Sequence, residues 1–194
     1  SLTLSGDAVL NVGGYSAIGT YGGTASLTMN DNAVYKGTSG RIGGRYQNPL
    51  TLDYNTVDIE MNGNAAIQYT SFFNIGEEYS NVTMTMNDAS SVTATSADFG
   101  WGVNTNSTAV LNGTSSIAVT GAFNIGVRGA GATGSVTLNN ESSVSAGNVN
   151  VGYNTADEAG ASSELILNDS ASVTTTTEQL RGATRRCTSR SLSS

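Results

Sequence analysis

Few residues of this chain could do chemistry. Acidic side chains stand close together twice, as Asp58 with Glu60 and as Glu77 with Glu78. In a strand, Asp58 and Glu60 would project from one face with their Cα atoms about 7 Å apart, which is compatible with the carboxylate pair of a glycosidase. Histidine is absent from all 194 residues, so the commonest general base, and the usual partner of a serine or cysteine nucleophile, is missing. The acidic pairs make cleavage of polysaccharides, as a lyase or hydrolase, one hypothesis. Because histidine is absent, we favour a protein that is not an enzyme.

Asparagine forms a second pattern, because it recurs six times directly after an apolar residue. In a stacked structure such amides would bond to one another as a ladder, and asparagine also tolerates the left-handed conformation of tight turns. Calcium needs six or more converging oxygens, whereas the nearby aspartates are scattered, so we predict no metal and no cofactor. The predicted ladder consists of Asn30, Asn62, Asn87, Asn112, Asn139 and Asn168.

The elements that must position these residues belong to a repeat. Each copy has an apolar residue directly before a turn, which we call the anchor. Apolar and polar residues alternate around it, which is the period of a strand. Six residues after each anchor comes another apolar residue, and thirteen or fourteen after it, in six of the seven copies, comes an apolar residue followed by glycine. The anchors recur every 25 to 32 residues and are Leu4, Met29, Met61, Met86, Leu111, Leu138 and Leu167.

A period of this length predicts coils that stack on copies of themselves. We predict an all-β, right-handed parallel β-helix (a β-solenoid) over residues 1–177, with about seven coils and three short strands per coil. The coils would start near residues 1, 26, 58, 83, 108, 135 and 164. Residues 178–194 break the pattern and hold Cys187 and four arginines, so they are a cap, a flexible basic tail or a non-native read-through.

The outward position of the first strand is threonine in four of the seven coils: Thr3, Thr28, Thr85 and Thr137. A threonine ladder on a flat face is typical of ice binding. Threonine also suits any solvated strand because it is β-branched, and the ladder is broken in three coils. We favour the structural interpretation.

The connection after each glycine varies most in length, and in solenoids such an edge often carries the binding site. The longest insertion, residues 45–54, contains the only proline and is our candidate recognition loop. Aromatic residues among polar neighbours would suit sugar rings, although they could equally seal the corners between coils. The candidate binding residues of this edge are Arg45, Tyr46, Tyr54, Tyr79, Trp101 and Tyr153.

Charge and composition limit the partners. The net charge of −7 argues against nucleic acid and anionic membranes, and no run is apolar enough to span a bilayer. Cys187 is the only cysteine, so no internal disulfide forms. The chain begins in the middle of a predicted strand, and we expect it to be a processed or excised piece of a longer protein.

The first coil reads LTLSGDAVLNVGGYSAIGTYGG. Its Leu-x-Leu strand, small turn, valine-rich strand and apolar-Gly pair resemble the tandem repeats of bacterial surface and autotransporter passenger proteins. The resemblance covers residues 1–177 and implies export to the cell surface with a structural or adhesive role; it supplies no catalytic residues.

Three functions follow as hypotheses. The first is a secreted or surface-displayed structural and adhesive solenoid that presents its variable edge to a carbohydrate or another cell-surface ligand. The second is a filament subunit that associates with itself through its coil ends, because an unprotected strand edge promotes assembly. The third is a polysaccharide lyase or hydrolase that uses the acidic pairs.

Overall fold

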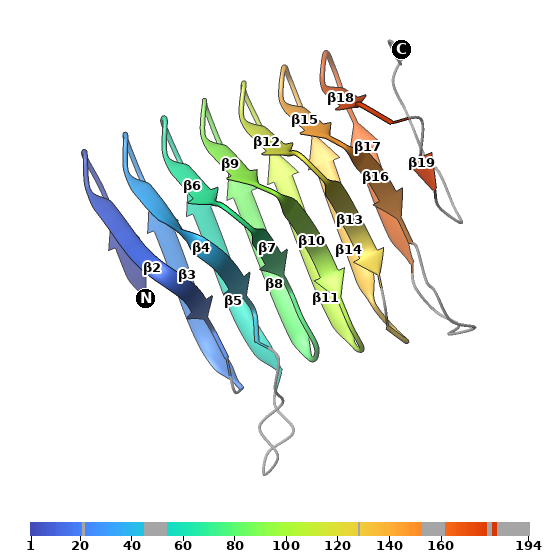
Figure 1. Ribbon diagram of the computed structural model, residues 1–194, viewed down its shortest axis with the longest axis horizontal. Helices are drawn as coiled ribbons and strands as arrows, with labels where there is room; N and C mark the ends of the chain where they lie inside the picture. The colour runs from blue at the N-terminus through green and yellow to red at the C-terminus, as the bar shows by residue number, and fades with distance from the viewer. Residues whose placement is uncertain (21, 45–53, 128, 153–161, 178–179, 182–194) are drawn as a thin grey trace.

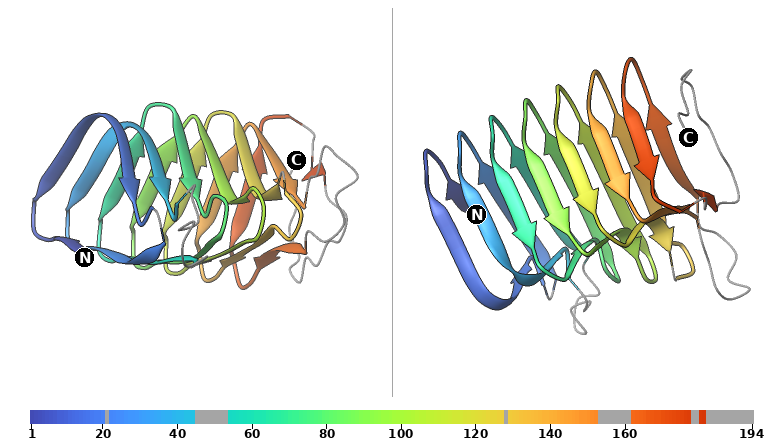
Figure 2. Two further views of the ribbon diagram at one scale, coloured as in Figure 1. Left: turned by 90° about the horizontal axis from the view of Figure 1, so that it is seen from below. Right: turned by 45° about the horizontal axis from the view of Figure 1, so that its top comes forward.

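The structure, a computed structural model, describes residues 1–20, 22–44, 54–127, 129–152, 162–177 and 180–181. It confirms the predicted β-solenoid. Every regular element in these ranges is a strand, every strand pairing is parallel, and the chain makes about six turns. Figures 1 and 2 show the coils side by side along one axis, with the N-terminal strands at one end and the C-terminal strands at the other.

The first sheet contains the anchor strands and has seven members in chain order. They alternate between buried and more exposed residues because one face covers the core and the other meets solvent. The strands are β1 (Leu2–Leu4), β3 (Gly23–Met29), β5 (Asn55–Met61), β8 (Ser80–Met86), β11 (Thr105–Leu111), β14 (Thr133–Leu138) and β17 (Ser163–Leu167).

The second sheet has twelve strands and takes the other two predicted strands of each coil. Second strands of successive coils pair with one another, and third strands do the same. Its members are β2 (Val9–Ile18), β4 (Val34–Ile42), β6 (Ala66–Tyr69), β7 (Phe72–Ile75), β9 (Ser91–Ala94), β10 (Ser96–Trp101), β12 (Ser116–Val119), β13 (Ala122–Val127), β15 (Ser143–Ala146), β16 (Asn148–Val151), β18 (Ser172–Thr175) and β19 (Leu180–Arg181).

The first two coils differ from the prediction of three short strands per coil. Their second and third runs join into the single strands β2 and β4, which pair along their length with a bulge between Val12 and Tyr15. Both β6 and β7 then pair with β4. The second and third strands are thus joined in β2 and β4, whereas the later coils have a break between them. Because β4 pairs with both β6 and β7, the column of second strands and the column of third strands belong to one sheet.

The repeat landmarks stack in register. The anchors face one another across the whole first sheet, from Leu4 opposite Met29 to Leu138 opposite Leu167. The two later landmarks form equivalent columns in the second sheet. Their side chains make one continuous apolar core, in which Leu2 and Leu4 of the first coil are only partly buried.

Glycine in the apolar-Gly landmark is required by the backbone. Each of the six has a positive φ, from 59° at Gly126 to 80° at Gly43, which side chains with a Cβ rarely adopt. At five of the six, Gly152 excepted, space is also missing; a Cβ at Gly76, for example, would lie 1.9 Å from the Ser107 Oγ. The landmark thus marks the corner at which the chain leaves the second sheet.

One strand lies within the predicted tail. Leu180 of β19 pairs with Val149, and Arg181 pairs with Asn150, so the third strand column continues into the seventh coil. The apolar-Gly landmark is absent there, because Leu180 is followed by arginine and not by glycine. Residues 182–194, including Cys187, lie outside the described residues.

Candidate functional site

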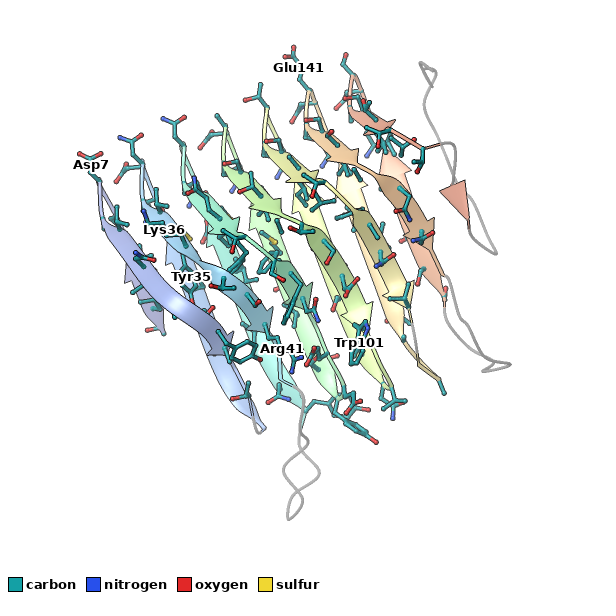
Figure 3. All side chains as sticks on the ribbon, viewed as in Figure 1. Asp7, Tyr35, Lys36, Arg41, Trp101 and Glu141 are labelled. Atoms are coloured by element: carbon teal, nitrogen blue, oxygen red, sulfur yellow. The ribbon has the colours of Figure 1, made fainter. Side chains whose placement is uncertain are left out.

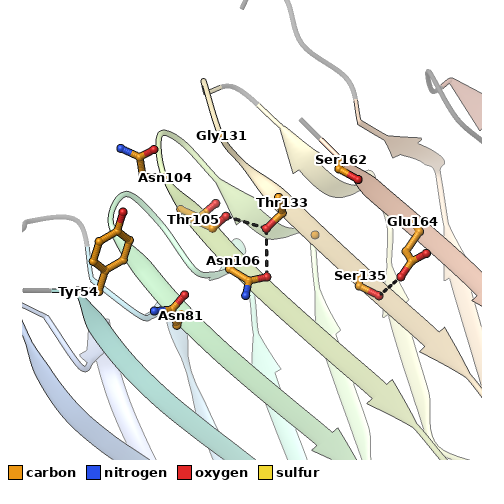
Figure 4. Close-up of a pocket in the computed structure, with 11 residues that line it drawn as sticks. Tyr54, Asn81, Asn104, Thr105, Asn106, Gly131, Thr133, Ser135, Ser162 and Glu164 are labelled. Atoms are coloured by element: carbon orange, nitrogen blue, oxygen red, sulfur yellow. Dashed lines mark hydrogen bonds between the residues drawn. The ribbon is translucent and has the colours of Figure 1, made fainter. Parts of the chain in front are cut away.

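The outer face of the first sheet carries a shallow groove of about 680 Å³, which we call the Tyr54 groove. It crosses the N-terminal ends of β8, β11, β14 and β17, so its walls come from five consecutive coils (Figure 4). Strand register places the lining residues, because Asn81 stands opposite Asn106, and Asn106 opposite Thr133. The lining consists of Tyr54, Asn81, Asn104, Thr105, Asn106, Gly131, Thr133, Gly134, Ser135, Ser162 and Glu164.

Hydrogen bonds within the Tyr54 groove orient its polar groups. The Thr133 hydroxyl contacts the Thr105 carbonyl oxygen at 3.0 Å and the Asn106 Oδ1 at 3.1 Å. At the far end, the Ser135 hydroxyl donates to the Glu164 carboxylate at 3.0 Å. Among the described residues of the lining, Glu164 is the only carboxylic acid and none is basic. The groove therefore offers amides and hydroxyls with little charge.

Tyr54 closes the other end of the groove and is 42% exposed. Its ring meets the Tyr79 ring edge to face, with centroids 6.2 Å apart and an interplanar angle of 75°. Tyr79 has a φ of 53° and stands at the corner that precedes β8. The two tyrosines come from adjacent coils, and the second fixes the ring orientation of the first.

The structure brings together only part of the predicted binding edge. Tyr54 and Tyr79 touch, and Tyr54 lines the groove. Trp101 is half-buried at the end of β10 and is not part of the groove lining (Figure 3). Arg45, Tyr46 and Tyr153 lie outside the described residues. Sequence reasoning missed the amides and hydroxyls of the lining, since they resemble ordinary solvent-facing strand residues.

The six asparagines of the predicted ladder do bond in a chain. Each Nδ2 from Asn62 onward donates to the Oδ1 of the previous asparagine at 2.8–3.0 Å, and the Asn30 Nδ2 contacts the Ser5 hydroxyl at 3.2 Å. The left-handed conformation falls on the following residue, for example Asp31 and Asp88. The Asp88 carboxylate in turn accepts from the Gly63 N–H of the previous coil at 2.9 Å. These turn tips share one edge, where Figure 3 labels Asp7 and Glu141.

The acidic pair Asp58 and Glu60 is exposed on the same face, outside the Tyr54 groove. The two residues share a small hollow of about 350 Å³ with Thr28, Thr83 and others. Asp58 accepts a hydrogen bond from the Thr83 hydroxyl, and Glu60 accepts one from the Asn62 amide at 3.3 Å. Both carboxylates are thus held by neighbours on an open strand surface.

Glu77, one of the acidic candidates for catalysis, is buried. Its side chain is 1% exposed. The carboxylate lies 2.9 Å from the Arg41 Nε and accepts a bond from the Asn74 amide at 2.9 Å. Because the carboxylate is withdrawn from solvent and paired, Glu77 is a structural residue and not a candidate catalytic group.

A second polar ladder lies on the outer side of the third strands. Register aligns Arg41, Asn74, Asp98, Asn124 and Asn150 in one column. The Asn150 amide donates to Asn124 at 2.7 Å, and the Asn124 amide donates to Asp98 at 2.5 Å. Its signal in the sequence is a polar residue directly before five of the six apolar-Gly pairs, a position that the apolar landmarks do not include.

In the described ranges, no three His, Cys, Asp or Glu side chains come close enough to share a metal ion. No helix that could cross a membrane occurs in the same ranges. A search of protein families, curated proteins and solved structures finds nothing that matches this chain.

Proposed function

We propose that the protein is a non-enzymatic structural and adhesive module that is secreted or displayed at a bacterial cell surface, as in autotransporter passengers, and binds a surface ligand through the outer face of its first sheet. The observation that carries the proposal is the Tyr54 groove, which is built from five consecutive coils and lined by oriented polar groups and an exposed tyrosine. A groove of this kind gains affinity from many weak contacts that act together.

The stacked coils support a role in display. The amide ladder joins every turn to the next, and the core is continuous through all coils. A structure that is tied together along its whole length holds a ligand-binding face at a fixed orientation. The extracellular location rests on the resemblance of the repeat to surface proteins.

Catalysis has less support. Of the four acidic candidates, Glu77 is buried in an ion pair, and Asp58 and Glu60 lie outside the Tyr54 groove. Incubation of the chain with neutral and acidic polysaccharides should release no new reducing ends and no unsaturated products. Release that is lost in Asp58→Asn and Glu60→Gln would favour the enzyme instead.

Assembly into filaments is a second candidate. The core residues Leu2, Leu4 and Leu10 of the first coil are only partly buried, whereas their equivalents in the next coil, Leu27, Met29 and Tyr35, are buried. This apolar surface would fit another coil. Electron microscopy at several concentrations separates the two functions: isolated short rods favour display, whereas long filaments one coil wide favour assembly.

Adhesion itself is tested with coated beads. Beads that carry the folded chain should attach to epithelial cell layers or to polysaccharide films more strongly than beads that carry the heat-unfolded chain. Equal attachment of the two kinds of bead to every surface would contradict the proposal.

A further inference from the structure

We infer that the Tyr54 groove binds a neutral, extended polysaccharide that lies along the solenoid axis. The inference rests on the proposed function and adds the chemical class and the direction of the ligand.

The lining selects against charged polymers. In the part of the chain that the structure describes, its polar groups are Glu164, the amides of Asn81, Asn104 and Asn106 and several hydroxyls, and no basic residue is among them. An anionic polymer would meet Glu164 and a chain of net charge −7, so repulsion would weaken its binding. Amides and hydroxyls both donate and accept hydrogen bonds, as do the hydroxyls of a neutral sugar.

Tyr54 supplies the apolar contact that a sugar ring needs. One face of a pyranose carries C–H groups, which pack on the flat face of an aromatic ring. The ring is 42% exposed and is braced edge-on by Tyr79, so it is already oriented before a ligand arrives. Pre-orientation lowers the entropy that binding costs.

The direction of the groove follows from the coils. Tyr54 precedes β5, Asn81 lies on β8, Asn106 on β11, Thr133 on β14 and Glu164 on β17. Neighbouring strands are about 4.8 Å apart, close to the length of one glycosyl unit in an extended chain. The groove runs across these strands on the outer face of the first sheet (Figure 4), so an extended polymer can lie along it. A straight β-1,4-linked glucan fits these features better than a coiled α-linked chain.

Affinity electrophoresis tests the inference with hydroxyethyl cellulose as the neutral extended polymer, dextran as the α-linked one and polygalacturonate as the anionic one. We expect hydroxyethyl cellulose to retard the folded chain most. Tyr54→Ala should weaken this retardation about tenfold and Asn81→Ala severalfold, whereas Tyr54→Phe should retain it. Tyr15→Ala and Gln68→Ala are matched controls, because they remove an exposed tyrosine and an exposed amide from the second sheet, and both should behave like the unmodified chain.

Three results would overturn the inference: no retardation by hydroxyethyl cellulose, equal retardation of Tyr54→Ala in a sample with the circular dichroism of the folded chain, or stronger retardation by polygalacturonate or dextran. Bead adhesion that persists alongside any of them would leave the proposed function intact and remove only this ligand. Loss of bead adhesion with glucan binding intact would leave this ligand in place and contradict the proposed adhesive function.

Discussion

Asn62 donates its amide hydrogen bond to Asn30 at 3.0 Å, although 32 residues separate them, whereas Asn87 reaches Asn62 over 25 residues at 2.8 Å. The geometry of the ladder is therefore independent of coil length. Insertions enter after the glycine corner and leave the turn unchanged. This separation lets one edge of the solenoid vary while the stacked turns hold the coils in register.

The amide ladder should contribute measurably to stability. Asn87→Ala would leave the Asn62 Oδ1 and the Asn112 Nδ2 without their bonds, and each unsatisfied half-buried group costs about 1 kcal/mol or more. We expect a loss of about 2 kcal/mol in the free energy of unfolding by urea. The matched control Asn81→Ala, at an exposed strand position, should change it by less than about 0.5 kcal/mol. An equal effect of the two changes would contradict a stabilising ladder.

Stacking at the turns is tested by a pair of glycines. Gly6 and Gly113 have nearly the same φ, 66° and 67°, so alanine meets the same backbone strain of about 1 kcal/mol at either position. A Cβ at Gly113 would lie 2.7 Å from the Asp88 carbonyl oxygen, whereas at Gly6 nothing lies within 4 Å. Gly113→Ala should thus lower the melting temperature clearly more than Gly6→Ala. The same lowering for both would mean that the coils are packed less closely at the turn.

The ion pair of Arg41 with Glu77 should be costly to break. Glu77→Ala leaves a largely buried guanidinium without its carboxylate, which typically costs about 3 kcal/mol. We discount this to about 2 kcal/mol because Arg41 is 21% exposed. Glu78→Ala is the neighbouring control and should have a small effect. The double change Arg41→Met with Glu77→Met should recover part of the loss, and no recovery would argue against the pair as the cause.

Most of the fold could be predicted because the landmarks follow from physical requirements of each coil. Leu4 and its equivalents must be apolar to fill the core, and Gly76 and its equivalents must be glycine to turn the corner. The asparagine ladder is visible for the same reason. Equivalent residues recur in every coil, so the copies of the repeat within one sequence can be compared with one another.

The site could be predicted only in part. Tyr54 was a candidate, but Asn81, Asn106 and Thr133 were not, because solvated strands use the same residue types and the groove exists only when the coils are aligned. The position of Glu77 could not be found from spacing, since its burial depends on Arg41 of the previous coil. The continuous strands β2 and β4 were missed because glycine and polar residues separate their apolar positions.

Tyr69 predicts how stability changes in alkali. Burial raises the pKa of its phenol well above the usual 10, and its hydroxyl bonds to Ser16 at 2.8 Å. The unfolded chain ionises this group near pH 10 while the folded chain keeps it neutral, so its stabilising effect is complete below pH 10 and declines above it. Between pH 9 and pH 11 the unmodified chain should lose about 1 kcal/mol more stability than Tyr69→Phe, as measured by urea unfolding. Parallel curves for the two proteins would contradict this assignment.

Binding on the first sheet is tested most directly by nuclear magnetic resonance on the ¹⁵N-labelled chain, titrated with a soluble β-1,4-linked glucan oligomer. We expect the amide signals of Asn81, Asn106 and Thr133 to shift together and to saturate at one ligand concentration. Signals of the equivalent strands β9, β12 and β15 on the second sheet should stay in place. Shifts confined to the second sheet, or no shifts at saturating oligomer, would contradict the account.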